Sequence, residues 1–165
     1  MALPFDGHLE TILLVEDHPA LLKLVTQILE DAKFTVIAAS SAKQAIQLES
    51  EFPGTIDLLL SDLRVTGTSG PSLAKKLKEQ RPQMRMVLMC GYPGGAMLLL
   101  NYGWHYVEKP LVALTLVSKI KDVLRGETRE QSTNRFDSLK DPRRPFGRVS
   151  LDNRPSALPR ARRRA

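Results

Sequence analysis

The chain has 165 residues, 42% of them hydrophobic, which suits one domain with an aliphatic core plus an appendage. Its single cysteine cannot form an internal disulfide, and no apolar run approaches the roughly 20 residues of a membrane helix. We therefore expect a cytoplasmic protein without a membrane span. The formal net charge of +6 arises from residues 127–165, which hold eleven basic and five acidic side chains. The excess charge thus belongs to a tail and does not indicate a basic, DNA-binding domain.

Residues 10–126 alternate between two kinds of segment. Continuous apolar runs predict five buried strands, at residues 11–16, 34–39, 57–61, 86–90 and 104–107. Apolar residues at helical spacing predict helices at residues 20–31, 41–51, 71–80, 94–102 and 110–125. Gly126 follows the last helix and is well placed to end it. This alternation predicts an α/β fold in which helices cover both faces of a parallel sheet.

The pattern stops after Gly126. Residues 127–165 contain four prolines and show no sustained helical or strand period, so we expect a disordered basic tail. The arginine-rich end, residues 160–164, is suited to nucleic acid, anionic lipid or an acidic protein. A solubilising extension explains the same composition equally well.

Chemically useful side chains follow the predicted strands at their carboxyl ends, where ligands bind to such sheets. They are Glu16, Asp17, Asp62, Cys90 and Lys109. Three carboxylates at one place repel each other unless a hard cation such as Mg²⁺ joins them. A carboxylate can also act as a nucleophile that forms an acyl phosphate, and a lysine can supply a compact positive charge. The pattern therefore indicates phosphoryl transfer onto Asp62.

Five segments, in this order and at this spacing, carry a family resemblance: Ile12–Pro19, Asp57–Leu63, Gly67–Gly70, Met89–Tyr92 and Tyr106–Pro110. On these segments, residues 10–126 resemble a response regulator receiver domain, the phosphoacceptor module of bacterial two-component signalling. The resemblance is greatest to receivers associated with hybrid sensor kinases. It implies a flavodoxin-like (βα)5 fold, a three-layer sandwich with a five-stranded parallel sheet in the order 2-1-3-4-5.

The resemblance also implies roles for individual residues. It makes Asp62 the phosphoacceptor and Glu16 with Asp17 the metal-binding pair. The backbone carbonyl of Arg64 would complete the protein's ligands to Mg²⁺ (or Mn²⁺). Lys109 would contact the phosphoryl group, and a cis peptide bond is expected between it and the following proline.

Two residues depart from the family's pattern, and one of them bears on the switch. The family usually has Ser or Thr where this chain has Cys90, and a thiol donates a weaker hydrogen bond than a hydroxyl. Tyr106 takes the place of the switch aromatic, but Cys90 is expected to weaken its coupling to the site, so a static packing role is equally consistent. Thr66 stands where the family usually has proline, which frees the loop and removes no chemistry.

The leading hypothesis is a single-domain receiver that acts as a phosphoacceptor and not as an enzyme. The reactions expected of it are at most its own phosphorylation and dephosphorylation. It would take a phosphoryl group from a sensor histidine kinase or phosphotransfer protein in a phosphorelay. It would then signal to a downstream protein through the face formed by residues 94–125. The alternatives are a receiver-like binding module whose phosphorylation no longer switches anything, and a nucleic-acid binder that acts through its tail.

Overall fold

A computed structural model of the chain describes residues 9–91 and 104–126, so the predicted helix at 94–102 and the predicted tail at 127–165 lie outside the described residues. A five-stranded parallel sheet is formed by β1 (Thr11–Val15), β2 (Thr35–Ala39), β3 (Leu58–Asp62), β6 (Arg85–Cys90) and β7 (His105–Glu108). Its order is β2-β1-β3-β6-β7, which is the predicted 2-1-3-4-5 when these five strands alone are counted. Among the described helices, none is long and apolar enough to cross a membrane.

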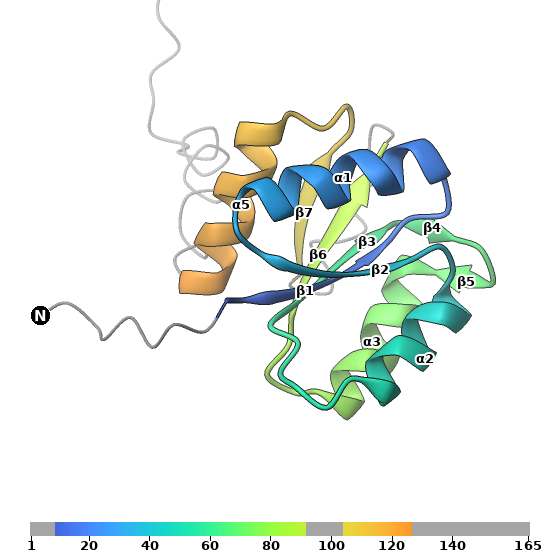
Figure 1. The fold of residues 1–165 in the computed structure, drawn as a ribbon. Coiled ribbons are helices and arrows are strands. Elements are labelled where there is room, and N and C mark those ends of the chain that lie inside the picture. The colour runs from blue at the N-terminus through green and yellow to red at the C-terminus, as the bar shows by residue number, and fades with distance from the viewer. Residues whose placement is uncertain (1–8, 92–103, 127–165) are drawn as a thin grey trace, which may run out of the picture. The chain divides into compact units, whose positions relative to one another are not determined.

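Helices cover both faces of this sheet, as the alternating pattern predicts. Helices α1 (Pro19–Asp31) and α5 (Ala113–Arg125) lie on one face, and α2 (Ala42–Glu51) and α3 (Gly70–Gln80) lie on the other (Figure 1). Successive side chains of a strand point to opposite faces. Accordingly Ile12 and Leu14 join the apolar cluster under α1 and α5, whereas Leu13 and Val15 join the cluster under α2 and α3. The continuous apolar run of β1 is therefore explained by burial on both sides.

The register of the sheet positions the chemically useful residues. Strands β1 and β3 are parallel neighbours with Val15 opposite Ser61, so the residues that follow them, Glu16 and Asp62, emerge at the same edge. Strand β6 pairs with β7 so that Cys90 lies opposite Glu108, and Lys109 follows directly. The carboxyl edge of the sheet thus collects residues that are far apart in the sequence.

The helix ends follow local signals. Ser41 and Ser69 cap α2 and α3, because each hydroxyl accepts a hydrogen bond from a backbone N–H in the first turn. Gly126 ends α5 in the left-handed conformation, with φ of 78°, as predicted. The predicted start of the last helix at residue 110 is wrong, since Val112 has extended backbone angles and the helix begins at Ala113.

A short hairpin that the sequence analysis did not predict follows β3. Strands β4 (Arg64–Val65) and β5 (Thr68–Ser69) pair antiparallel across a two-residue turn, in which Gly67 has φ of 97°. A turn with positive φ at its second central residue favours glycine at that place. Two-residue strands carry no detectable period, which is why the hairpin escaped prediction.

Candidate functional site

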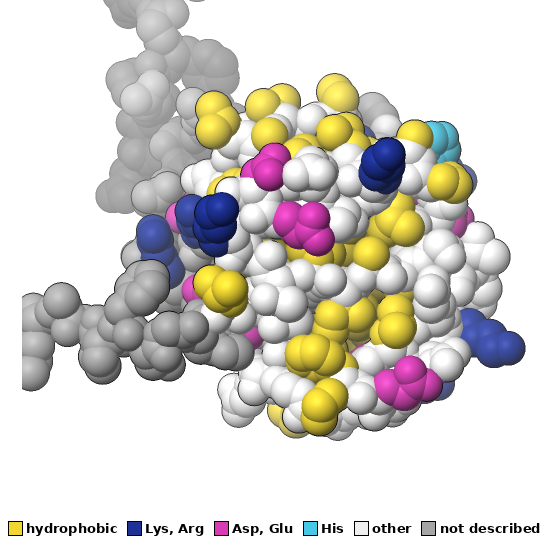
Figure 2. All heavy atoms as spheres, viewed as in Figure 1, with side chains coloured by type: hydrophobic (Ala, Val, Ile, Leu, Met, Phe, Trp, Pro, Cys, Tyr) yellow, Lys and Arg dark blue, Asp and Glu magenta, His cyan; other side chains and the backbone are white. Residues whose placement is uncertain are grey.

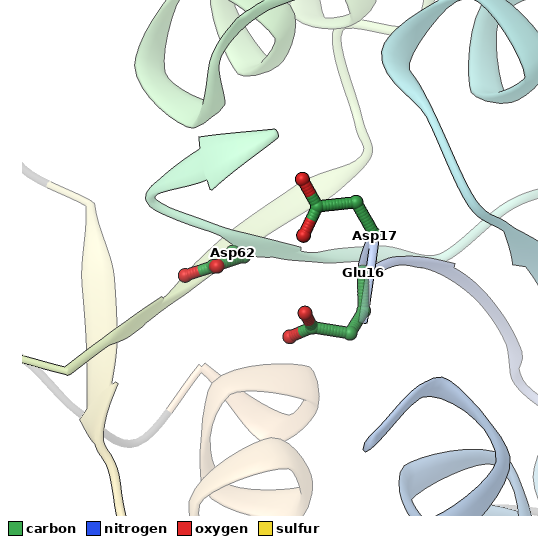
Figure 3. A group of neighbouring side chains, drawn as sticks. All are labelled: Glu16, Asp17 and Asp62. Carbon is green, nitrogen blue, oxygen red and sulfur yellow. The ribbon is translucent and has the colours of Figure 1, made fainter. Parts of the chain in front are cut away.

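Three carboxylates meet at the carboxyl edge of the sheet. One oxygen each from Glu16, Asp17 and Asp62 lies within 4.8 Å of the others (Figure 3). The first two residues come from the end of β1 and the third ends β3. Their environments differ, because Glu16 is buried, Asp17 is exposed and Asp62 is intermediate. The group is therefore open to solvent on the side of Asp17 and anchored in the protein on the side of Glu16.

Lys109 supplies the positive charge of the group. Its Nζ donates a hydrogen bond to Oε2 of Glu16 at 2.9 Å and lies 3.3 Å from Oδ2 of Asp62. The other oxygen of Glu16, Oε1, accepts a hydrogen bond from the backbone N–H of His18 at 3.1 Å. Both oxygens of this buried carboxylate are thus engaged, and the lysine bridges it to Asp62. Lys109 was predicted to contact the phosphoryl group on Asp62, and its shorter contact to Glu16 was not predicted.

The backbone around Asp62 holds its carboxylate in place. Oδ1 accepts a hydrogen bond from the N–H of Leu63 at 2.7 Å, and the carbonyl of Leu63 accepts one from the N–H of Gly70 at 2.9 Å. A Cβ atom on Gly70 would overlap the carbonyl oxygen of Asp62 and crowd Cα of Leu63. Glycine is therefore required at residue 70 so that α3 can start against the segment that carries Asp62.

The donor set fits a hard divalent cation. All three side chains offer carboxylate oxygens, the ligands that Mg²⁺ prefers, and a cation would offset the repulsion between them. Arg64 lies two residues after Asp62 as the first residue of β4, and the role of its carbonyl as a further ligand stays a prediction. A cation in this place would be bound on one side by protein oxygens and would face solvent near Asp17.

Cys90 lies beside this group at the end of β6, and its side chain is packed among apolar residues. The residue is 2% exposed and forms a small cluster with Leu63 and Leu88, against which Tyr106 packs. Its carbonyl accepts a hydrogen bond from the N–H of Lys109 at 2.7 Å. The predicted switch pair, Cys90 and Tyr106, therefore shares one cluster, and Cys90 is joined to Lys109 through the backbone.

Two further features concern the segments next to the site. The Lys109–Pro110 peptide bond is cis, as predicted. Thr66, in the turn of the β4–β5 hairpin, donates a hydrogen bond from Oγ1 to Oδ2 of Asp17 at 2.9 Å. This role of Thr66 was not predicted from the sequence. The glycine after Thr66 could have indicated a tight turn at this place. It could not have indicated the contact between Thr66 and Asp17, which are 49 residues apart.

Comparison with known proteins agrees with this geometry. The family model described as "Response regulator receiver domain" matches residues 12–121. The sensor kinase CckA of Brucella abortus (strain 2308) is 27% identical over 117 residues, which are 69% of this chain and 12% of that protein. The transcriptional regulatory protein CpxR of Escherichia coli (strain K12) is 34% identical over 117 residues, 69% of this chain and 49% of that protein. The chain therefore spans less than half the length of these curated relatives.

Solved structures show the same similarity. A response regulator receiver domain protein from Clostridium thermocellum aligns with a TM-score of 0.65 and 25% identity, covering 79% of this chain and 99% of that one. The receiver domain of the hybrid histidine kinase CckA aligns with a TM-score of 0.60 and 30% identity, covering 69% and 98% respectively. In both alignments the similarity extends over nearly the whole of the solved domain.

Proposed function

The chain belongs to the response regulator receiver family, and on that premise we propose that it accepts a phosphoryl group on Asp62 from a phosphohistidine. The donor would be a sensor kinase or a phosphotransfer protein of a phosphorelay. The observation that carries the proposal is the cluster in which three carboxylates share one edge of the sheet with the ammonium group of Lys109. Catalysis of phosphoryl transfer consists mostly of positioning and charge stabilisation, and this cluster offers both. The chain acts as a phosphoacceptor and turns over no substrate of its own beyond its own phosphorylation and dephosphorylation.

Each residue of the cluster has a part in this reaction. Glu16, Asp17, Asp62 and the carbonyl of Arg64 would hold Mg²⁺ (or Mn²⁺), which offsets negative charge on the phosphoryl group when bound. An oxygen of Asp62 attacks phosphorus while the phosphorus–nitrogen bond to the donor histidine breaks, and the electron pair of that bond stays on the imidazole nitrogen. Lys109, whose Nζ lies 3.3 Å from Oδ2 of Asp62, stabilises the charge on the phosphoryl oxygens.

Chemical phosphorylation tests this proposal without a partner. The protein is incubated with acetyl phosphate and Mg²⁺, and intact mass spectrometry is expected to show the addition of one phosphoryl group. Asp62→Asn abolishes the addition, and EDTA suppresses it. Asp31→Asn, which changes an exposed carboxylate on α1, is the matched control and is expected to leave it unchanged. No mass increase, or an increase that survives in Asp62→Asn, would contradict the proposal.

The burial of Cys90 favours a second candidate function, a receiver-like binding module that is phosphorylated without switching. The thiol is packed among apolar side chains and donates weakly, whereas a hydrogen bond to a charged group is worth about 1.5–3 kcal/mol. Loss of most of that energy reduces the bias towards a switched state by roughly tenfold or more. Amide chemical shifts of α5 decide between the two functions. Changes on phosphorylation in both the wild type and Cys90→Thr support a working switch, and changes in Cys90→Thr alone support the second function.

Exposed apolar side chains on α1 and at the start of α5 suggest where the phosphoryl donor docks. Leu24 on α1 is 53% exposed, and Val112 and Leu114 at the start of α5 are 59% and 84% exposed. Figure 2 shows apolar side chains at the surface over α1 and along the edge strand β2 below it. We place the donor protein on the α1 and α5 side of the site, because docking there buries these side chains and brings a histidine towards Asp62.

Separate rates from two donors test this docking surface. Leu114→Asp is expected to slow transfer from a cognate histidine kinase at least tenfold and to leave phosphorylation by acetyl phosphate unchanged. Leu9→Asp is the matched control, since Leu9 is 55% exposed but precedes β1 at the opposite edge of the sheet. Equal loss with both donors would indicate damage to the site, and no loss with either would place the donor elsewhere.

The remaining parts of the function concern the output and the cellular setting. We propose that the downstream protein binds the face formed by residues 94–125, of which β7 and α5 belong to the described residues. We also propose that the receiver comprises residues 10–126, followed by the basic tail at 127–165, and that it works in the cytoplasm. Loss of downstream binding in variants of exposed α5 residues, with phosphorylation retained, tests the output surface.

A further inference from the structure

The turn of the β4–β5 hairpin reaches the metal-binding residues through one side chain. Thr66 donates a hydrogen bond from Oγ1 to Oδ2 of Asp17 at 2.9 Å, although the two residues are 49 positions apart. Both are exposed, and Asp17 precedes the cap of α1. The contact therefore joins the loop after β1, which carries Glu16 and Asp17, to the hairpin that follows β3, which ends in Asp62.

Thr66 is itself held on both sides. It lies between Val65 and Gly67 in the hairpin, whose strands pair in fixed register, and its carbonyl accepts a hydrogen bond from the N–H of Ala42 at 3.4 Å. Ala42 begins α2, so the turn is tied to the start of that helix. Threonine is branched at Cβ and has few accessible rotamers. The hydroxyl is thus presented to Asp17 from a defined place.

Asp17 depends on this contact more than the other two carboxylates depend on any single partner. Glu16 is held by His18 and Lys109, and Asp62 by Leu63 and Lys109. Within residues 9–91 and 104–126, the hydrogen bond from Thr66 is the one that fixes the carboxylate of Asp17, and its Oδ1 accepts none. Without the hydroxyl, an exposed side chain would have to be ordered by the cation itself.

We propose that Thr66 is a positioning residue of the metal site, which orients Asp17 for a divalent cation before the cation arrives. This inference rests on the metal site of the proposed function. Groups that orient metal ligands typically contribute about 10–100-fold to metal affinity. Because the contact between Thr66 and Asp17 is exposed, we expect its contribution to affinity to be about tenfold or less. Loss of the hydroxyl is expected to weaken Mn²⁺ binding by roughly three- to tenfold.

Direct measurement of Mn²⁺ binding tests this role. Free Mn²⁺ is titrated by electron paramagnetic resonance against the full chain as wild type, Thr66→Val, Thr66→Ser and Thr68→Val. Thr66→Val retains the branched shape and loses the donor, so it is expected to weaken binding by the stated factor. Thr66→Ser retains the donor and is expected to bind within twofold of the wild type. Thr68→Val, in the same hairpin, is the matched control and is expected to leave binding unchanged.

A structural role for Thr66 gives a different result. If the residue only stabilised the hairpin, Thr66→Val would lower the urea midpoint, and the loss of Mn²⁺ affinity would scale with that change and not be restored by serine. Equal Mn²⁺ affinity of the wild type and Thr66→Val overturns the inference while leaving the metal site intact. Failure of the wild type to bind Mn²⁺, or binding unaffected by Asp17→Asn, overturns both the metal site and the inference.

Discussion

Replacement of Lys109 by methionine tests the charge arrangement of the site most directly. The change removes the ammonium group that lies 2.9 Å from Oε2 of Glu16 and 3.3 Å from Oδ2 of Asp62. The side chain of Glu16 is 1% exposed, so water cannot replace the lost cation there. Removal of one partner of a buried ion pair typically costs 3–5 kcal/mol, because the other charge is left buried.

Two features of the site reduce this cost. Lys109 is itself 21% exposed, and Glu16 keeps the hydrogen bond from the N–H of His18. We therefore expect Lys109→Met to lower the free energy of unfolding by about 2–3 kcal/mol in the presence of EDTA. Urea denaturation followed by circular dichroism measures the difference. Lys121→Met, which removes an exposed lysine on α5, is the matched control and is expected to change stability by less than about 0.5 kcal/mol.

Metal ions should reduce the difference in the free energy of unfolding between the wild type and Lys109→Met. A cation stabilises a folded protein by about 2.7 kcal/mol when its free concentration is one hundred times its dissociation constant. Lys109→Met should gain more stability than the wild type from the same cation, because the cation also replaces the missing positive charge. The loss in Lys109→Met is thus expected to be smaller in saturating Mg²⁺ than in EDTA. A loss below about 1 kcal/mol in EDTA, or a loss that is equal in both conditions, would refute this account of the charge.

Three other predictions concern Gly70 beside the site and two polar side chains of the scaffold, Arg81 and Lys78. Gly70→Ala places a Cβ atom against the carbonyl oxygen of Asp62. We therefore expect it to lower the free energy of unfolding, measured with urea, by about 1–3 kcal/mol and to slow phosphorylation by acetyl phosphate. Unchanged stability and rate would show that the backbone shifts to accommodate the methyl group. Arg81→Met removes the partner that lies 2.6 Å from the Glu49 carboxylate, whose side chain is 6% exposed. We expect this change to lower the free energy of unfolding by about 2–4 kcal/mol, because the Glu49 charge is left buried. A loss below about 1 kcal/mol would mean that water reaches Glu49 in the variant. Burial lowers the pKa of Lys78 below 10.5, so the unfolded state binds more protons between the two pKa values, and the stability contributed by this group should rise with pH in that window. A titration of its ammonium group by NMR that gives a pKa at or above 10.5 would contradict this assignment.

The fold was predictable because its central strands β1, β3 and β6 are buried on both faces. The run Ile12–Val15 is apolar throughout, and the strand that contains it, Thr11–Val15, ends one residue before the expected end. Alternation with amphipathic helices then predicted a parallel sheet with helices on both faces, and the family resemblance supplied the order of its strands. The hairpin at Arg64–Ser69 could not be found in this way, since its strands have two residues each and its formation depends on one glycine with positive φ.

The proximity of the site residues could also be predicted from the sequence, but the hydrogen bonds and ion pairs between their side chains could not. Parallel strands place their carboxyl ends at one edge, so Glu16, Asp62 and Lys109 were expected to lie close together. Which oxygen each donor reaches depends on side-chain torsions and on the path of the loops. The closer approach of Lys109 to Glu16, and the contact of Thr66 with Asp17, are both of this kind.

The pairing of Lys109 has a consequence for the order of events at the site. Three negative charges face one lysine, whose ammonium group is divided between a buried carboxylate and the phosphoacceptor. A phosphoryl group that arrived alone would add negative charge and would compete with Glu16 for the same ammonium group. A divalent cation that binds first takes over the charge of the carboxylates and leaves Lys109 available for the phosphoryl oxygens. Lys109→Met should accordingly be most destabilising in the absence of metal, so the unfolding experiment in EDTA and Mg²⁺ tests the charge balance on which this order of binding depends.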